Sequence, residues 1–372
     1  MKLRNPPAFF RSFPTGIFFI LIIYVLFFPD KSSENVLDGC ALFFNSVFPS
    51  LFPFFVLSGY AVNSGIESSL GKLFGIIPRL LKINSGQYAY IISVLSGYPT
   101  SAKVVCEGYL QGKITKSDAQ KLLILCSNAS AAFIISYIGG TLLRNNTAAF
   151  ILLTANYLSP VCASVMLSLS YTENGTPLKQ TDSSPGSGAV TAFVTSVKDS
   201  VTSILNVGAY IIIFSVIIGM FECFLGKNEI SSLIYSLLEM SRGCGDVSKL
   251  DLIYPLRLGI MGFIIGFGGL CVMFQNYSFI EKTDLDKNIF FCYKIITGIF
   301  GFIISYILST IFIAGNISVF NPMNKVNEML FADANILLLM LMLIIILYTV
   351  IYFKADNEDE NKRNFNMGGR RA

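Results

Sequence analysis

Apolar runs separated by short polar stretches are the main pattern of this chain. About eight to ten of the runs are apolar enough to lie in a bilayer, whose hydrocarbon core a helix of roughly 20 residues can cross. The clearest runs cover residues 17–28, 41–62, 148–169, 204–224 and 289–313. The pattern therefore predicts an all-α polytopic membrane protein.

Two apolar segments of membrane length are interrupted near their middle. Residues 88–106 contain Ser-Gly-Tyr-Pro-Thr-Ser-Ala-Lys at 96–103, and residues 253–275 contain Gly-Phe-Gly-Gly at 266–269. A helix break leaves backbone groups unpaired, and a bilayer tolerates this only where the chain is buried or lines a wet cavity. Paired interruptions indicate the substrate site of a transporter. The alternative is two kinked helices that only pack against their neighbours.

The two halves of the chain follow a similar plan. Residues 122–143 are interrupted too, by Ser-Asn-Ala-Ser at 127–130, and the short apolar segment 230–240 ends at a polar stretch. In the second half, as in the first, a long apolar span precedes a short segment and a broken one. We therefore expect two inverted repeats that contain broken helices and two re-entrant hairpins.

The repeats divide the chain into six parts. The first apolar run follows basic residues and lacks a small-residue cleavage site, so we expect it to remain as a helix with its basic end in the cytoplasm. A stretch rich in Ser, Thr, Gly and Pro indicates a flexible linker between the repeats. The predicted parts are an N-terminal transmembrane helix with its flank (1–39), the first repeat (40–171), the linker (172–188), the second repeat (189–315), a loop with a C-terminal transmembrane helix (316–353) and a disordered tail (354–372).

Composition supports the membrane class and excludes several kinds of chemistry. Hydrophobic residues make up 53% of the 372 residues and charged residues 13%, against about 25% charged residues in soluble domains. The chain has no histidine, which excludes Ser-His-Asp and Cys-His nucleophiles and HExxH zinc sites. Its eight cysteines are scattered without a CxxC pair. We therefore expect no enzyme, no metal and no cofactor, and the net charge of +4 gives no sign of nucleic-acid binding.

Four stretches resemble a known family. Leu-Phe-Pro-Phe-Phe-Val-Leu-Ser at 51–58 resembles its LFPFFILSE segment, and residues 95–103 resemble its SGYPxGAK motif. Residues 239–243 and 268–275 resemble its E-I-T-x-G and SGLSVHAQ segments. The family is the YlbJ-type, or SpoVV-type, sporulation integral membrane proteins, which carry a nucleoside-recognition gate domain. The chain departs from it at Met273, where members often have His, and at Ser101, where they often have Gly.

The resemblance covers roughly residues 40–315 and implies a role in spore formation. Related proteins move dipicolinate, the dicarboxylate of the spore core, out of the mother cell across the outer forespore membrane. The resemblance therefore implies an integral membrane protein with two gate-type repeats, whose partners are the lipid bilayer and a small anionic solute. A coupling cation or proton and a homo-oligomer are compatible with the sequence.

An aromatic dianion needs positive potential and unpaired hydrogen-bond donors. The break at Gly97–Pro99 would start a half-helix near Thr100, whose N-terminus provides both. Lys103 lies one turn further on, and a cation inside an apolar segment is a functional candidate. Its alternatives are a structural pair with Glu107 or an extended position at the interface. Tyr98 could stack on the solute or only pack.

Polar residues of the other interruptions complete the candidate site. Asn128 sits mid-segment, where solute contact and helix–helix hydrogen bonding are equal alternatives. Glu239 could bind a proton or cation for coupling, or lie at the water interface. The candidate binding residues are Ser96, Gly97, Tyr98, Thr100, Ser101, Lys103, Ser127, Asn128, Ser130, Glu239, Ser241, Gly268, Gly269 and Gln275.

The predicted function is solute translocation by alternating access, without covalent chemistry. The preferred solute is dipicolinate, and a nucleoside-like solute is the alternative within the same class. A second class is a membrane scaffold that transports nothing and recruits sporulation partners. Polar groups inside the membrane that can be replaced without effect would favour the scaffold.

Overall fold

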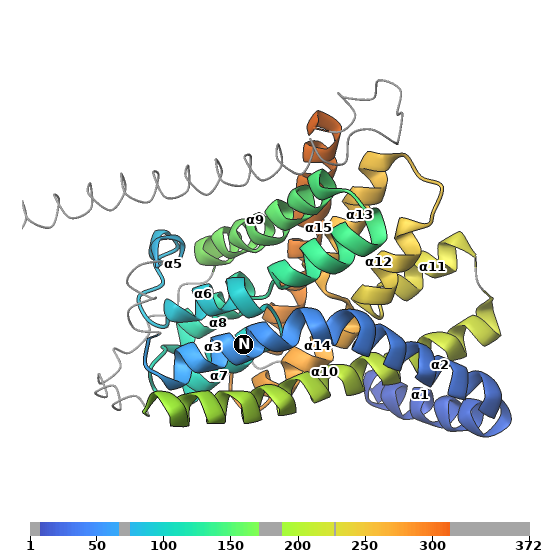
Figure 1. The fold of residues 1–372 in the computed structure, drawn as a ribbon, viewed down its shortest axis with the longest axis horizontal. Coiled ribbons are helices and arrows are strands. Elements are labelled where there is room, and N and C mark those ends of the chain that lie inside the picture. Colours follow the sequence, from blue (N-terminus) through green and yellow to red (C-terminus); the bar gives the residue numbers. More distant parts are fainter. Residues whose placement is uncertain (1–7, 67–74, 171–187, 227, 313–372) are drawn as a thin grey trace, which may run out of the picture. The chain divides into compact units, whose positions relative to one another are not determined.

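The computed structural model describes residues 8–66, 75–170, 188–226 and 228–312, all of which belong to one compact unit, Met1–Asn316. These residues form helices and no strand (Figure 1). Most of the linker 172–188, the C-terminal helix expected within 316–353 and the tail 354–372 lie outside the described residues. The elements are α1 (Ala8–Phe27), α2 (Pro29–Leu42), η1 (Phe43–Val47), α3 (Phe48–Asn63), α5 (Ile76–Leu80), α6 (Tyr88–Ser96), α7 (Thr100–Leu110), α8 (Lys116–Leu125), η2 (Phe133–Leu143), α9 (Asn146–Ser170), α10 (Ala189–Leu225), α11 (Glu229–Ser236), α12 (Met240–Ser248), α13 (Tyr254–Phe267), α14 (Gly269–Ile280) and α15 (Lys287–Phe312).

Five helical stretches among the described residues are long and apolar enough to cross a membrane. This confirms the all-α polytopic class. The number is smaller than the eight to ten apolar segments of the sequence, because several segments are halves of broken helices or arms of hairpins. The five stretches are Pro29–Ala61, Asn146–Ser168, Ala189–Phe224, Tyr254–Ile280 and Lys287–Phe312.

The first interrupted segment is a hairpin rather than a broken span. A Cβ atom on Gly108, near the end of α7, would lie 2.7 Å from the hydroxyl of Tyr88, at the start of α6. The two arms therefore run back along each other, and the chain reverses at Gly97–Pro99. Gly97 has φ +68°, a conformation that residues with a Cβ rarely adopt. We call α6, α7 and the tip between them hairpin 1.

A second hairpin follows α10. It consists of α11 and α12, which lie side by side in Figure 1, and its tip is Leu237–Glu239. A Cβ atom on Gly243 would lie 2.6 Å from Cα of Ser236, so the two arms touch near the tip. The side chains of Asn228 and Glu239 accept hydrogen bonds from the first turns of α11 and α12, which fixes where each arm begins. We call this element hairpin 2.

Each hairpin is followed by a broken helix. In the first half α8 ends at Leu125, residues Cys126–Ser130 form a turn and an irregular stretch (break 1), and the chain continues into η2. In the second half α13 ends at Phe267 and α14 begins at Gly269, and we call Gly268–Gly269 break 2. Gly268 and Gly269 have φ +87° and +75°, which interrupts the helix without a steric penalty.

Each hairpin tip is hydrogen-bonded to the break that follows it. The backbone N–H of Tyr98 donates to Asn128 O at 2.9 Å, and the N–H of Leu270 donates to Leu237 O at 2.8 Å. The Cys271 N–H donates to the carbonyl of the next tip residue at 2.8 Å. A hairpin, the break that follows it and a long helix thus form one structural unit, which occurs twice. The long helix is α9 in the first unit and α15 in the second. The sequence pattern predicts that residues 88–106 correspond to residues 253–275. The contacts show instead that hairpin 1 corresponds to hairpin 2 and that break 1 corresponds to break 2.

The two units have opposite directions. The loop between α14 and α15 lies against the start of α8, because Lys116 Nζ and Asp284 Oδ2 are 2.9 Å apart and Asp286 N donates to Gln120 Oε1 at 2.9 Å. The broken helix α8–η2 therefore starts where the broken helix α13–α14 ends. This antiparallel placement is the arrangement of inverted repeats.

The ion pair between these loops yields a small, pH-dependent prediction. Hydrogen bonds from Tyr109 and Lys116 hold the pKa of the Asp284 carboxyl below its usual range. A depressed carboxyl pKa stabilises the fold above the unfolded-state pKa of about 3.9, and this contribution is lost as the pH falls. The pair is exposed, so we expect Asp284→Asn to cost under about 1 kcal/mol at neutral pH and nothing at strongly acidic pH. Thermal unfolding followed by circular dichroism at both pH values tests this, and an equal cost at both would contradict it.

Candidate functional site

The two tips and the two breaks meet near the middle of the molecule. The Tyr98 hydroxyl at the tip of hairpin 1 donates to Met240 Sδ, in the first turn of hairpin 2's second arm, at 2.6 Å. A Cβ atom on Gly268, in break 2, would lie 3.8 Å from the Tyr98 ring. A Cβ atom on Gly97 would lie 2.5 Å from Ser130 N, in break 1. The starts of η2, α7, α12 and α14 therefore converge on one region.

A cavity of about 30 Å³ lies at this meeting point. It has room for about two water molecules and not for an organic solute. Five of the predicted binding residues line it together with apolar side chains. The lining residues are Val47, Leu51, Tyr98, Ala129, Ser130, Phe133, Val207, Ile211, Glu239, Met240, Ser241, Val272 and Gln275.

Two polar side chains of this central cavity, Glu239 and Ser130, accept hydrogen bonds from backbone N–H groups. The Glu239 carboxylate is 2% exposed and accepts hydrogen bonds from the N–H groups of Ser241 and Arg242 at 2.9 and 2.7 Å. It therefore occupies the positive N-terminus of α12. Ser130 Oγ accepts the N–H of Phe133 at 3.2 Å and serves the start of η2 in the same way. These two N-termini are closed by the protein's own side chains.

The start of α7 is different, because no side chain caps it. It borders a larger cavity of about 150 Å³ between α7, α10 and α14. Thr100 lines this cavity, and its Oγ1 is buried without a hydrogen-bond partner among the described residues. Lys103, one turn along, makes no ion pair within 4.0 Å to any described residue, so the alternative of a structural pair with Glu107 is not realised. The lining residues are Pro99, Thr100, Lys103, Ser203, Asn206, Val207, Tyr210, Gln275, Ser278 and Phe279.

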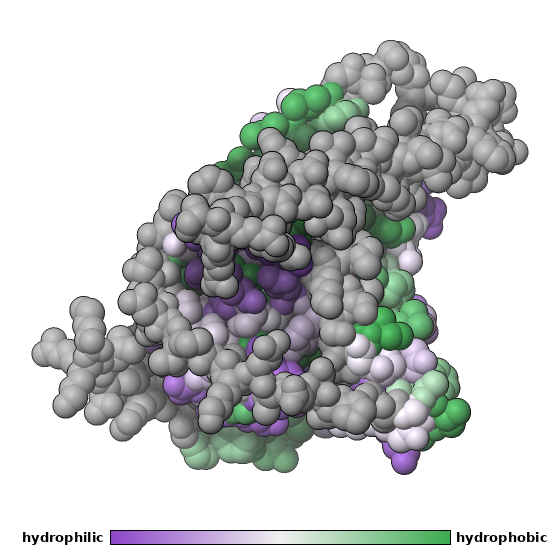
Figure 2. All heavy atoms as spheres, turned by 90° about the vertical axis from the view of Figure 1, so that its left-hand side faces the viewer, coloured by the Kyte–Doolittle hydropathy of each residue, from purple (hydrophilic) through white to green (hydrophobic). Residues whose placement is uncertain are grey.

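The larger cavity adjoins two others through shared residues. Gln275 and Val207 also line the central cavity, and Thr100 and Lys103 also line a cavity of about 70 Å³ that reaches Glu107 and Asp199. Three cavities thus follow one face of α10. Figure 2, which views the left-hand side of Figure 1, shows hydrophilic side chains gathered in a hollow at the end where α10 begins.

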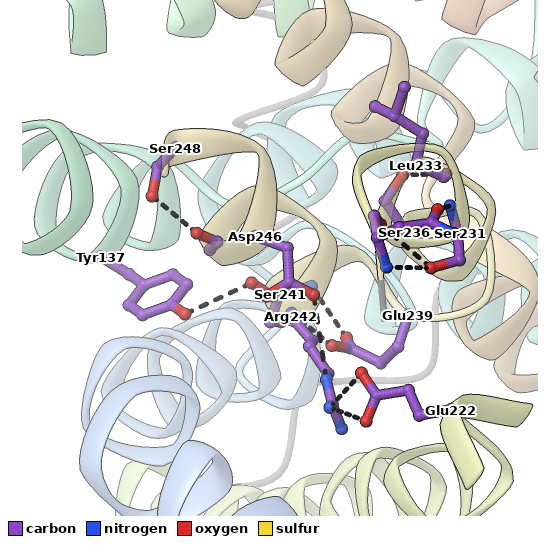
Figure 3. A network of polar contacts seen from close by, with 12 residues as sticks. Tyr137, Glu222, Ser231, Leu233, Ser236, Glu239, Ser241, Arg242, Asp246 and Ser248 are labelled. Atoms are coloured by element: carbon purple, nitrogen blue, oxygen red, sulfur yellow. Dashed lines mark hydrogen bonds and ion pairs between the residues drawn. The ribbon is translucent and has the colours of Figure 1, made fainter. Parts of the chain in front are cut away.

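The opposite end of α10 carries a second polar region. Arg242 lies against Glu222 with Nη2 2.8 Å from Oε2, and Asp246 is 4.0 Å away from the same guanidinium (Figure 3). Cavities of about 300 and 310 Å³ are lined by these charged side chains, by Asp38 and by the exposed Lys249. The cation of Arg242 is thus neutralised, unlike that of Lys103.

Break 1 is held by a residue that the sequence analysis did not identify. Asn156 on α9 is buried, and its side chain accepts the N–H of Ala129 at 2.9 Å and donates to the carbonyl of Ala129 at 3.0 Å. A helix–helix hydrogen bond thus replaces the backbone partners that the break removes. An asparagine inside an apolar run could have indicated that Asn156 is important. The sequence does not show its partner, because the tertiary fold determines which residue it bonds.

We expect Asn156→Ala to destabilise the protein by about 1–3 kcal/mol, because it leaves two buried backbone groups of break 1 unpaired. Thr154→Ala on the same helix is the control, since the Thr154 hydroxyl bonds only its own helix at Phe150 O. Thermal unfolding in detergent, followed by circular dichroism, measures both. Equal midpoints for the two variants would contradict the support role of Asn156.

A second missed residue is Lys294 on α15. Its side chain is fully buried, Nζ donates to Ser127 O in break 1 at 3.0 Å, and Nζ lies 5.5 Å from the centroid of the Tyr98 ring. The signal was available, because an isolated lysine inside an apolar segment is a functional candidate by default.

The structure brings most of the predicted residues together but gives them different places. Tyr98, Ser130, Glu239, Ser241 and Gln275 line the central cavity. Thr100 and Lys103, with Gln275, line the larger one. Ser127 Oγ and Asn128 Oδ1 are buried in break 1 without a partner.

The remaining predicted residues shape the backbone or lie away from these cavities. Gly97 touches break 1, Gly268 lies near Tyr98, and Gly269 lies against the tip of hairpin 2. Ser96 Oγ donates to Ile92 O within its own helix at 2.7 Å, and neither Ser96 nor Ser101 lines the three cavities.

The fold and this site define an all-α polytopic membrane protein with paired hairpins and broken helices around internal cavities. The chain is 23% identical over 324 residues to the sporulation integral membrane protein YlbJ of Bacillus subtilis, and the similarity covers 77% of this chain and 79% of that protein. This similarity supports the YlbJ family. No family model matches the chain, and no solved structure matches it.

Proposed function

We propose that this protein is a sporulation membrane transporter that moves dipicolinate across the outer forespore membrane by alternating access. The observation that carries the proposal is the 150 Å³ cavity, which combines an unpaired lysine, an unpartnered hydroxyl and the uncapped start of a half-helix. These are the groups that recognise an anion. The role in sporulation is supported by the similarity to YlbJ.

The size of the cavity favours a single-ring solute. A cavity of about 150 Å³ holds one benzene-sized ring. Dipicolinate adds two carboxylates to such a ring, whereas a nucleoside adds a ribose to its base, so dipicolinate is the smaller of the two solutes. Tyr210 and Phe279 provide aromatic surface for a ring, and Lys103 lies at the start of α7 to meet a carboxylate. Pyridine-2,6-dicarboxylate, which is dipicolinate, has one ring and two negative charges.

Alternating access is supported by cavities towards both ends of α10 with a narrow region between them. The central cavity is too small for a solute, and the contact of Tyr98 with Met240 joins the two hairpins in its wall. Cavities of about 150 and 300 Å³ lie on either side of this region along α10. A relative movement of the two hairpins would open one side at the expense of the other. No covalent step is part of the proposal.

Uptake of radiolabelled dipicolinate into proteoliposomes tests the proposal. We expect saturable uptake that unlabelled dipicolinate inhibits strongly, that the monocarboxylate picolinate inhibits weakly, and that uridine does not inhibit. Inhibition by uridine as strong as by dipicolinate would transfer the proposal to a nucleoside-like solute. Absence of uptake under imposed gradients of protons and cations would contradict transport and favour the scaffold.

A further inference from the structure

Lys294 is a cation in a place where a transporter with broken helices would hold a coupling ion. The residue lies inside the span Lys287–Phe312, and its side chain is fully buried. No ion pair with a described acidic residue balances its charge. Burying an unbalanced charge is costly, so the groups around Nζ decide whether the ammonium is favoured at this position.

The surroundings of Nζ are those of a cation site. The ammonium donates to Ser127 O in break 1, two residues beyond the C-terminal end of α8, where the helix dipole is negative. The face of the Tyr98 ring, 5.5 Å away, adds a cation–π attraction. Two further oxygen atoms of break 1, Ser127 Oγ and Asn128 Oδ1, are buried without a partner among the described residues, so neither accepts a hydrogen bond from Nζ. Carbonyl, hydroxyl and amide oxygens are the ligands that hard metal cations prefer.

Unwound carbonyls and half-helix C-termini coordinate coupling ions in transporters with discontinuous helices. We propose that Lys294 is a built-in cation of break 1, whose ammonium fills the position that an alkali-metal ion such as Na⁺ would otherwise occupy. One consequence rests on the proposed transport function. If Lys294 takes the place of the ion, solute movement requires no Na⁺ at this break. The same ammonium fixes the Ser127 carbonyl and the Tyr98 ring, so it positions the tip of hairpin 1 against break 1.

The test measures the thermal midpoint of the purified full chain in NaCl and in choline chloride at equal ionic strength. Lys294→Ala removes the ammonium and leaves space for an ion, whereas Lys294→Met fills similar space without a charge. Lys287→Ala at the start of the same helix is the control, since Lys287 forms an exposed pair with Glu281. This readout does not require transport, so it separates a failure of the inference from a failure of the proposed function.

We expect Lys294→Ala to lower the midpoint by about 5 °C in choline chloride, and Na⁺ or methylammonium to restore roughly half of that loss. Lys294→Met, the control variant and the natural protein should show no difference between Na⁺ and choline. In proteoliposomes, uptake by the natural protein should be equal in the two salts. A natural protein stabilised by Na⁺, or uptake that requires Na⁺, would overturn the inference. It would also be overturned by a Lys294→Ala variant that responds to neither cation.

Discussion

We expect that replacing Lys103 with glutamine reduces dipicolinate uptake by at least about thirtyfold and leaves the protein folded. Lys103 lines the 150 Å³ cavity, and no described residue forms an ion pair with it. Removing one partner of a desolvated charge pair costs about 2–5 kcal/mol, and 1.4 kcal/mol corresponds to a tenfold change in affinity. Initial uptake rates over a range of dipicolinate concentrations measure the effect, which should fall mainly on the apparent affinity.

Two comparisons make this prediction specific. Circular dichroism should show that Lys103→Gln unfolds within a few degrees of the natural protein, because the lysine has no structural partner to lose. Lys103→Arg keeps the charge and should retain part of the uptake. If Lys103→Gln transported dipicolinate at the natural rate and affinity, the cavity beside α7 would not be the solute site.

The second large effect concerns the tip of hairpin 1. Gly97→Ala should lower stability by several kcal/mol or prevent folding, for two reasons that can be separated. The alanine would need φ near +68° with ψ near −167°, a region that costs about 1–3 kcal/mol and that essentially only glycine adopts, and its Cβ would lie 2.5 Å from the backbone nitrogen of Ser130. The second effect pushes the tip away from break 1, which breaks the hydrogen bond from Tyr98 N to Asn128 O.

Gly112→Ala is the matched control for this prediction. Gly112 has a similar φ of +71°, but no described atom lies within 4 Å of its missing Cβ. It should therefore show the cost of a positive φ without the steric contact. Thermal unfolding of both variants in detergent measures the difference. Equal destabilisation at the two positions would mean that the close contact between the tip and break 1 is unimportant.

Hydropathy was sufficient to predict the membrane class and the positions of the interruptions. It could not distinguish a hairpin from a broken span, because both are about 20 apolar residues with a polar centre. Residues 88–106 and 253–275 have this pattern alike, yet the first belongs to hairpin 1 and the second to a broken helix. The distinction depends on Gly108 lying beside Tyr88, which is a contact between the two arms and not a property of either.

Site residues could be predicted from the sequence where they belong to the same segment. Thr100 and Lys103 share the start of α7, and their spacing already places them within one turn of each other. Asn156 and Lys294 were missed because their partners, Ala129 and Ser127, lie in break 1, at a distance in the sequence that only the tertiary fold closes. The role of Glu239 also depended on local backbone geometry, since its carboxylate caps α12.

The proposed function requires that a dianion binds in the cavity between α7, α10 and α14. Titration calorimetry of dipicolinate with the purified protein tests this requirement when two lysine variants are compared. Lys103→Gln alters this cavity, and Lys249→Gln makes the same change in the cavity of about 300 Å³ at the other end of α10. Our account predicts that Lys103→Gln loses binding and Lys249→Gln keeps it. Binding that survives in Lys103→Gln and is lost in Lys249→Gln would contradict the account.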